Sequence, residues 1–149
     1  MKTDLINIRK ATSKDLNIIL RIQKNDGFKH AYYLTRDRFE RLLNRGEVFY
    51  LAEKETGGPL GFMSIDCEVR AKLHLSSVHK KYQNKRVGTT LLNYVVSRVK
   101  SRGYKRIYVY TEIASPAENF LLTRGFEKAG YYKDRYGEGR DANILELDL

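Results

Sequence analysis

The chain contains little cysteine and no long apolar run, and these gaps limit the class of protein it can be. Its single cysteine, Cys67, cannot form a disulfide within the 149-residue chain. No apolar stretch approaches the length needed to cross a bilayer. Residues 1–5 lack the hydrophobic segment of a signal peptide. We therefore expect a cytoplasmic protein with no membrane partner.

Several common sequence features are also missing. The chain has no internal repeat, low-complexity tract or linker, so we expect one domain over residues 1–149. Its hydrophobic fraction of 42% is sufficient for a proper core. It has neither the Gly-Lys-Ser/Thr ending of an ATP-binding loop nor a Gly-x-Gly-x-x-Gly dinucleotide motif. These two cofactor classes are therefore not indicated.

Positive charge is present in excess. The chain has 28 Lys and Arg residues against 18 Asp and Glu residues, a formal net charge of +10. Such an excess concentrates anions around a protein, and nucleic acid, an acidic protein or a phosphorylated cofactor would all qualify. A solvated basic surface explains the same number without any ligand. The charge argues against a polycation, such as a polyamine, as the preferred substrate.

Strand-like and helix-like segments alternate along the chain. In the first half, the patterns predict strands at 6–8, 48–53, 60–65 and 73–78, with helices beginning at Thr12 or Ser13 and at Thr35. In the second half, they predict a long helix from Val87 to Gly103, a strand at 107–111, a helix from Ser115 to Gly125, and strands at 126–132 and 143–149. This alternation indicates an α/β sheet covered by helices.

The segment 73–92 carries the strongest signal for a binding site. A strand ends at Val78, a basic turn follows, and a helix begins near Val87. The first N–H groups of a helix have no partner within it, and the helix dipole adds partial positive charge there. Lys80, Lys81, Lys85 and Arg86 add full charges to the same place, and Gly88 would let a ligand approach the backbone. An ordinary basic helix start, with Gly88 serving packing, explains the pattern equally well.

The same segment resembles a known family. Residues 78–92, VHKKYQNKRVGTTLL, are similar to the acetyl-CoA motif of the GNAT superfamily of N-acetyltransferases, with Gln83 at its first position, Gly88 at its last and Arg86 replacing a glycine. Residues 114–126, ASPAENFLLTRGF, resemble the second family motif, and the order of elements matches too. The resemblance implies the GNAT-type acyl-CoA N-acyltransferase fold: a mixed, mostly antiparallel sheet of six to seven strands, flanked by about four helices.

The resemblance also implies a reaction. It predicts transfer of an acetyl group from acetyl-CoA to a primary amine by direct attack in a ternary complex, with no metal. The acceptor would be a protein N-terminus, a lysine or a small amine, and the tail from Tyr131 to Leu145 resembles N-terminal protein acetyltransferases. A homodimer is a further expectation, since dimers are common in the superfamily.

Family analogy places acetyl-CoA where the strands 73–78 and 107–111 part. Backbone groups of the first strand would meet the pantetheine arm, and the basic turn would hold the diphosphate. The cofactor-binding residues expected on this basis are Ser76, Ser77, Val78, Gln83, Asn84, Lys85, Arg86, Val87, Gly88, Thr89 and Asn119.

The usual acid and base positions of the family are occupied by other residues. Leu121 stands where many members have a Tyr acid, and Val109 and Lys72 stand where others have Glu. We therefore expect Glu112 to accept the amine proton and Tyr132 to donate to the leaving thiolate. His74 is interpreted mainly as a structural histidine facing opposite to Leu73 and Leu75. Tyr32 and Tyr33 are expected to wall the substrate site.

Two rival functions remain open at this stage. Basic residues interleave with aromatics at 80–86, 98–106 and 128–135, as in nucleic-acid or ribonucleoprotein binding modules. No nucleic-acid motif is present, so nucleic acid is not the expected partner. The replaced acid and base positions also fit an acetyl-CoA sensor that has the fold but little catalysis.

Overall fold

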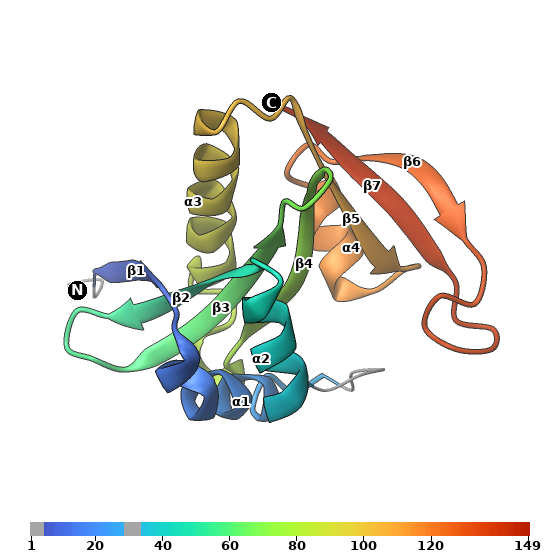
Figure 1. The fold of residues 1–149 in the computed structure, drawn as a ribbon. Helices are drawn as coiled ribbons and strands as arrows, with labels where there is room; N and C mark the ends of the chain where they lie inside the picture. The colour runs from blue at the N-terminus through green and yellow to red at the C-terminus, as the bar shows by residue number, and fades with distance from the viewer. Residues whose placement is uncertain (1–4, 29–33) are drawn as a thin grey trace.

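Seven strands form one mixed sheet in the computed structural model, which describes residues 5–28 and 34–149 (Figure 1). Tyr32 and Tyr33 lie outside the described residues. The strands are β1 (Ile6–Lys10), β2 (Val48–Lys54), β3 (Pro59–Asp66), β4 (Ala71–Val78), β5 (Arg106–Glu112), β6 (Glu127–Tyr132) and β7 (Ala142–Asp148). Their order across the sheet is β1-β2-β3-β4-β5-β7-β6. Only β4 and β5 pair in parallel, so the expected mixed, mostly antiparallel sheet is confirmed.

Helices cover both faces of this sheet in the described part of the chain. The α-helices are α1 (Leu16–Lys24), α2 (Arg36–Asn44), α3 (Val87–Ser101) and α4 (Pro116–Leu122), with short 3-10 turns at Ser13–Asp15 and Lys80–Tyr82. The start of α4 is as expected, because the Ser115 side chain accepts from the Glu118 N–H and Pro116 takes the first helical position. No helix of the described residues is long and apolar enough to span a membrane.

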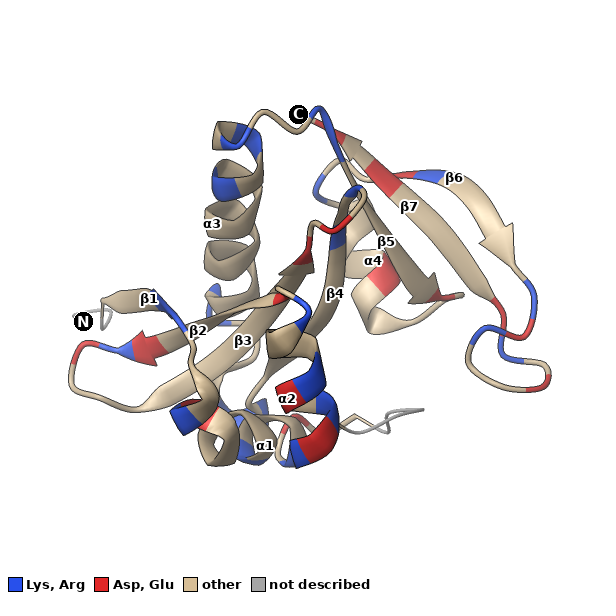
Figure 2. Ribbon diagram, in the orientation of Figure 1, with Lys and Arg blue, Asp and Glu red and all other residues tan. Residues whose placement is uncertain are grey.

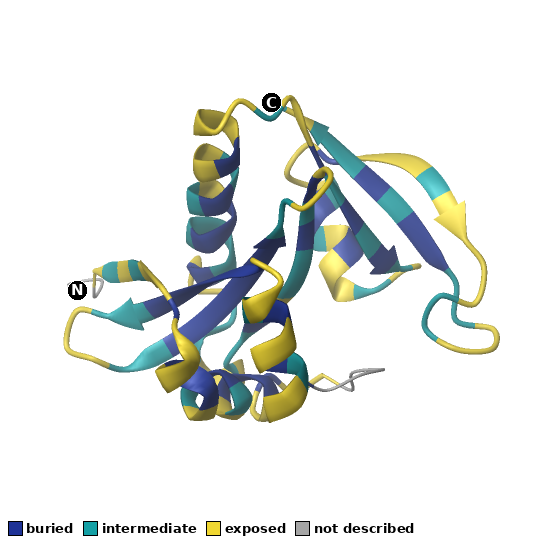
Figure 3. Cartoon of the chain, in the orientation of Figure 1, coloured by how far each residue is buried: buried dark blue, intermediate teal, exposed yellow. Residues whose placement is uncertain are grey.

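Successive side chains along each strand point to opposite faces of the sheet, so the core consists of two layers. In β2, Tyr50 and Ala52 pack on the side of α3, whereas Phe49 and Leu51 pack on the side of α1 and α2. The buried residues run along the centre of the sheet in Figure 3. Each face of the sheet therefore has its own helical cover.

The strands β4 and β5 stay together over only three residue pairs. Their register runs from Ala71 opposite Ile107 to Leu73 opposite Val109 and then stops. β4 nevertheless continues to Val78 and β5 to Glu112. The two strands therefore part, as Figure 1 shows, and leave the backbone edge of β4 without a neighbouring strand beyond Leu73.

A β-bulge in β4 changes which side chains face which layer. Leu73 pairs with Ile65 and Ser76 with Met63, so β4 holds one extra residue here. The Leu75 N–H donates to the Ser64 Oγ at 3.0 Å instead of continuing the regular ladder. As a result Leu75 packs with the α1–α2 layer, while Leu73 packs with α3. The expectation that His74 faces opposite to Leu73 is correct, but the same expectation for Leu75 is wrong.

Candidate functional site

The turn before α3 exposes a row of backbone N–H groups. Asn84 and Arg86 both adopt left-handed conformations, with φ of 61° and 67°. Left-handed residues next to right-handed ones turn successive N–H groups toward the same side, which forms an anion-binding concavity. Within the described residues, the N–H groups of 84–89 have no hydrogen-bond partner. These amides, together with the α3 dipole, can hold a phosphate group.

Buried polar contacts fix this turn to the rest of the fold. The Gln83 Nε2 donates to the Val78 carbonyl at 3.0 Å and to the Asp26 carbonyl at 2.6 Å. The Ser77 hydroxyl donates to the Asp26 carboxylate at 2.6 Å. The side chains of Gln83 and Ser77 therefore brace the turn against the end of α1. Any contact that they make with a cofactor stays a prediction.

The free edge of β4 offers two further donors. The N–H groups of Leu75 and His79 point toward β3, since they donate to the Ser64 Oγ and to the Leu60 carbonyl. By the alternation of an antiparallel strand, the N–H groups of Ser76 and Val78 point to the other side, into the gap beside β5. Donors in this gap could receive the carbonyl oxygen of an acyl group lying between the strands.

The beginnings of α3 and α4 lie against each other. A Cβ added at Gly88 would lie 3.4 Å from the Phe120 Cζ, so the absent side chain faces α4. This distance is at the short end of ordinary van der Waals contact, so an alanine would fit and only a larger side chain would press on Phe120. The Arg124 guanidinium stacks on Phe120 and donates to the Thr89 Oγ1 at 2.6 Å. Arg124 is a cation beside the turn that the sequence did not reveal, because no local pattern joins it to α3.

The remaining expected cofactor residues are distributed around this turn. Lys85 and Arg86 are exposed, and the Val87 side chain is buried in the core. Asn119 is exposed on α4. Leu121 and Val109 stand at two of the positions where the family usually has its acid or base. Both side chains are apolar and buried in the α3 layer.

The carboxyl end of β5 carries Glu112, which is already engaged. The Arg140 guanidinium donates to both of its carboxylate oxygens, each at 2.7 Å. This pairing lowers the pKa of Glu112 below its ordinary value. A carboxylate held in this way is a weaker proton acceptor, which counts against its expected role as base. That role stays a prediction.

Aromatic rings cover the α2-side face of β5 and its neighbours. The Tyr132 ring is half exposed and lies edge-on to Tyr110, with the centroids 6.0 Å apart. The Tyr136 hydroxyl donates to the Tyr110 carbonyl at 3.0 Å. The Arg135 guanidinium lies over the rings of all three tyrosines, between 5.1 and 5.9 Å from their centroids. The loop between β6 and β7 is thereby held next to β5. The expected role of Tyr132 as acid is untested by these contacts.

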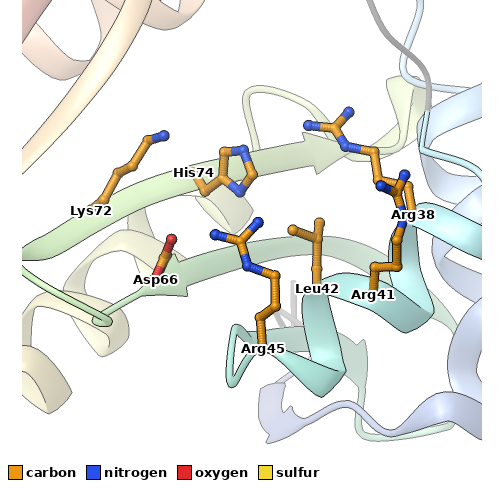
Figure 4. A pocket seen from close by; sticks show the side chains of 7 residues that line it. All are labelled: Arg38, Arg41, Leu42, Arg45, Asp66, Lys72 and His74. Atoms are coloured by element: carbon orange, nitrogen blue, oxygen red, sulfur yellow. The ribbon is translucent and has the colours of Figure 1, made fainter.

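A cavity of about 290 Å³ opens on the α2 side, beside the point where the strands part. Figure 4 shows side chains from α2 directed toward the part of β4 that carries Lys72 and His74. The lining residues are Arg38, Arg41, Leu42, Arg45, Asp66, Lys72 and His74. All of the lining residues except Leu42 have charged or polar side chains, which suits a charged group better than an apolar one.

His74 is part of a buried pair. Its Nδ1 lies 2.8 Å from the Glu47 Oε1, and the two side chains are 17% and 2% exposed. With a neutral imidazole and an ionised Glu47, this contact requires the hydrogen on Nδ1, and Nε2 is then an acceptor. The other oxygen of Glu47 is buried without a hydrogen-bond partner among the described residues.

The end of α2 determines where Glu47 lies. Gly46 has a φ of 92°, and the Gly46 and Glu47 N–H groups donate back to the Leu43 and Leu42 carbonyls. This is the Schellman arrangement, in which a left-handed glycine ends a helix. It turns the chain directly into β2 and places Glu47 beside His74 of β4. The contact between Glu47 and His74 depends on this turn and could not be predicted from the sequence.

Comparison with known proteins identifies the family of this chain. A sequence model of the acetyltransferase (GNAT) family matches residues 14–126. The chain belongs to this family. An uncharacterised N-acetyltransferase from Methanocaldococcus jannaschii is 28% identical over 136 residues, a match that covers 81% of this chain and 60% of that relative.

Solved GNAT structures share the fold of this chain at low identity. The ribosomal-protein-S18-alanine N-acetyltransferase of Escherichia coli superimposes with a TM-score of 0.84 at 19% identity, covering 97% of this chain and 94% of that one. Ard1 of Thermoplasma volcanium gives 0.84 at 17%, covering 97% of each chain. The PaiA N-acetyltransferase of Thermoplasma acidophilum, solved with coenzyme A, gives 0.79 at 19%, covering 97% and 99%. The expected GNAT fold is therefore confirmed.

Proposed function

We propose that this chain transfers an acetyl group from acetyl-CoA to a primary amine by direct attack in a ternary complex. The observation that carries the proposal is the parting of β4 from β5 between two unlike sites. The amide-lined turn of residues 84–89 lies at one side, and the cavity with His74 lies at the other. Family membership and the neighbour solved with coenzyme A support the cofactor.

The cofactor side needs only groups that the fold already presents. The amides of 84–89 hold the diphosphate, and Lys85, Arg86 and Arg124 add charge around it. The N–H groups of Ser76 and Val78 donate to the thioester carbonyl oxygen. That oxygen gains negative charge as the amine attacks, so donors positioned there lower the barrier.

His74 is the proton acceptor in this proposal. Its Nε2 takes a proton from the attacking amine nitrogen while Glu47 holds the ring from the other side. The nitrogen then forms a bond to the acetyl carbon, the carbon–sulfur bond breaks, and coenzyme A departs as the thiolate. His74 replaces Glu112 in this role because Arg140 occupies both carboxylate oxygens of Glu112. Tyr132 stays the expected donor to the thiolate.

A thiol-release assay over a panel of primary amines tests this function. The expected result is coenzyme A release that requires both acetyl-CoA and an amine, together with an acetylated amine in the mass spectrum. Calorimetry with coenzyme A is run in parallel. Tight cofactor binding without transfer to any amine would contradict the proposal and favour a sensor. Salt-dependent RNA or DNA binding without coenzyme A affinity would favour the nucleic-acid module.

A further inference from the structure

The cavity beside β4 is lined mainly by cations. Arg38, Arg41 and Arg45 project from one side of α2, and Lys72 extends from β4 opposite them (Figure 4). Among the described lining residues, Asp66 is the one acid. Figure 2 shows basic and acidic residues mixed along α2, and the arginines at 38, 41 and 45 are the ones that line the cavity. The cavity therefore has a positive field beside the point where β4 and β5 part.

Most of these charges are not neutralised by neighbours. Arg45 pairs with Glu68 at 3.3 Å, but both side chains are more than 60% exposed, so water screens this contact. The guanidinium groups of Arg38 and Arg41 make no ion pair within the described residues. Two guanidinium groups that line one cavity and pair with no acid of residues 5–28 and 34–149 can bind a ligand with negative charge.

The positive field continues across the sheet to the loop between β6 and β7. The Lys72 ammonium lies 5.0 Å from the centre of the Tyr110 ring, and Arg135 lies 5.1 Å from the same ring. Burial, followed by the nearby charge of Arg135, lowers the pKa of Lys72 below its ordinary value. The two cations therefore repel each other, and an anion between them would relieve that repulsion.

We propose that the acceptor is an amine that carries carboxylate groups close to the amino nitrogen. An amine without them would enter as a bare ammonium ion, which Arg38, Arg41 and Lys72 repel. Carboxylates compensate for this repulsion by pairing with the guanidinium groups. The remaining cations then favour the uncharged amine that attack requires. This inference rests on the proposed acetyl transfer and specifies its substrate class.

Two sources supply this chemistry, and both belong in the test. One is a peptide with acidic residues directly after its first residue, and the other is a free acidic amino acid. The probes are peptides beginning Ala-Glu-Glu, Ala-Gln-Gln and Ala-Lys-Lys, together with free glutamate and glutamine. Each set changes charge while keeping the amine and the approximate size constant.

A matched pair of variants links any preference to the cavity. Arg41→Glu reverses a charge that lines the cavity, and Arg36→Glu reverses one on the opposite side of the same helix. Both residues are exposed, so both variants should fold. Coenzyme A affinity, measured by calorimetry, should be unchanged in each and serves as the readout of intact structure.

The expected result is a kcat/KM about tenfold higher for the acidic acceptor than for its neutral partner, and lower again for the basic peptide. Arg41→Glu should reduce this preference markedly, because it removes one of the four lining cations and adds an acid, while Arg36→Glu should keep the preference. Turnover of free glutamate but not of peptides would support the inference with a small acceptor as its source. Equal or better turnover of the basic peptide would overturn the inference and leave acetyl transfer intact. No transfer to any acceptor would overturn both.

Discussion

The two sides of the parted strands are built in different ways. The side facing the start of α3 consists of backbone N–H groups from one continuous stretch, residues 84–89. The side facing α2 consists of side chains from α2, β4, β5 and the loop between β6 and β7. A backbone site tolerates changes of side chain, whereas an assembled site depends on each residue. We therefore expect the first to serve the constant cofactor and the second to select the acceptor.

The largest expected effect is on the acceptor side. His74→Asn should lower kcat by about a hundredfold or more, because a positioned proton acceptor contributes roughly 10²–10⁴-fold. Coenzyme A affinity should not change. Glu112→Gln is the matched control, and we expect less than about tenfold from it because Arg140 already occupies that carboxylate. Steady-state kinetics checks both variants. A larger loss from Glu112→Gln would reverse the assignment of the base.

The next effect concerns the packing of α3 on α4. Gly88→Val should weaken coenzyme A binding by more than about tenfold, because the added carbons press on Phe120 and displace the amides of the turn. Calorimetry measures the affinity, and Gly88→Val combined with Phe120→Ala removes the clash. We expect the double variant to recover most of the affinity, because Phe120 is the neighbour that the added carbons meet. A double variant that stays weak would contradict this cause and mean that the side chain at 88 obstructs the ligand directly.

The contrast between the two sides also explains what the sequence predicted. The basic turn before α3 was recognisable because its residues are contiguous and a helix start has a fixed chemistry. His74 was interpreted as structural because its partner, Glu47, is 27 residues away and a β-bulge redirects the strand. The cationic cavity could not be foreseen either, since its arginines become neighbours of Lys72 only when α2 crosses β4.

The order and kind of elements could be predicted almost completely. Caps at Thr35 and Ser115 lie where they were expected, as does the left-handed Gly103 after α3. These signals act within one turn of backbone, so a local pattern is sufficient to predict them. The bulge at Leu75 depends on the Ser64 hydroxyl of a neighbouring strand, which no local pattern records.

A substitution at the start of α1, away from both sites, should lower the stability of the fold without changing the acceptor preference. Asp15 is buried and accepts hydrogen bonds from Arg9 at 2.7 and 3.0 Å and from the Thr12 N–H at 2.8 Å. Asp15→Asn should reduce the free energy of unfolding by about 1–3 kcal/mol at neutral pH. The ratio of acidic to basic acceptor turnover should not change. A changed ratio would show that Asp15 reaches the cavity.

The Asp15 carboxylate should also make the free energy of unfolding depend on pH. The hydrogen bond from Arg9 lowers the pKa of Asp15 below its ordinary value of 3.8. Its stabilising contribution is therefore fully present above the unfolded pKa and is lost as the pH falls through the lower folded pKa. Urea unfolding should show a large difference between wild type and Asp15→Asn at pH 7, which shrinks below about pH 3.8. A difference that persists at lower pH would contradict this explanation.

The smallest expected effect comes from removing a side chain from the turn of residues 84–89 while keeping its backbone N–H groups. Arg86 occupies a left-handed conformation that favours glycine, so Arg86→Gly should stabilise the fold by about 0.5–1 kcal/mol. Coenzyme A affinity should fall less than about fivefold, the range of an exposed charge contact. Lys85→Gly is the matched control, because it also removes a charge but at a residue whose φ is not positive. We expect it to give no gain in the free energy of unfolding. Thermal unfolding and calorimetry check both variants.

The account depends most on the amides of residues 84–89 holding the diphosphate. An NMR titration of ¹⁵N-labelled protein with coenzyme A observes those N–H groups directly. The account predicts that the amide resonances of 84–89 shift most, with those of Ser76 and Val78 next. Saturating coenzyme A that leaves residues 84–89 unchanged while resonances elsewhere shift would contradict it.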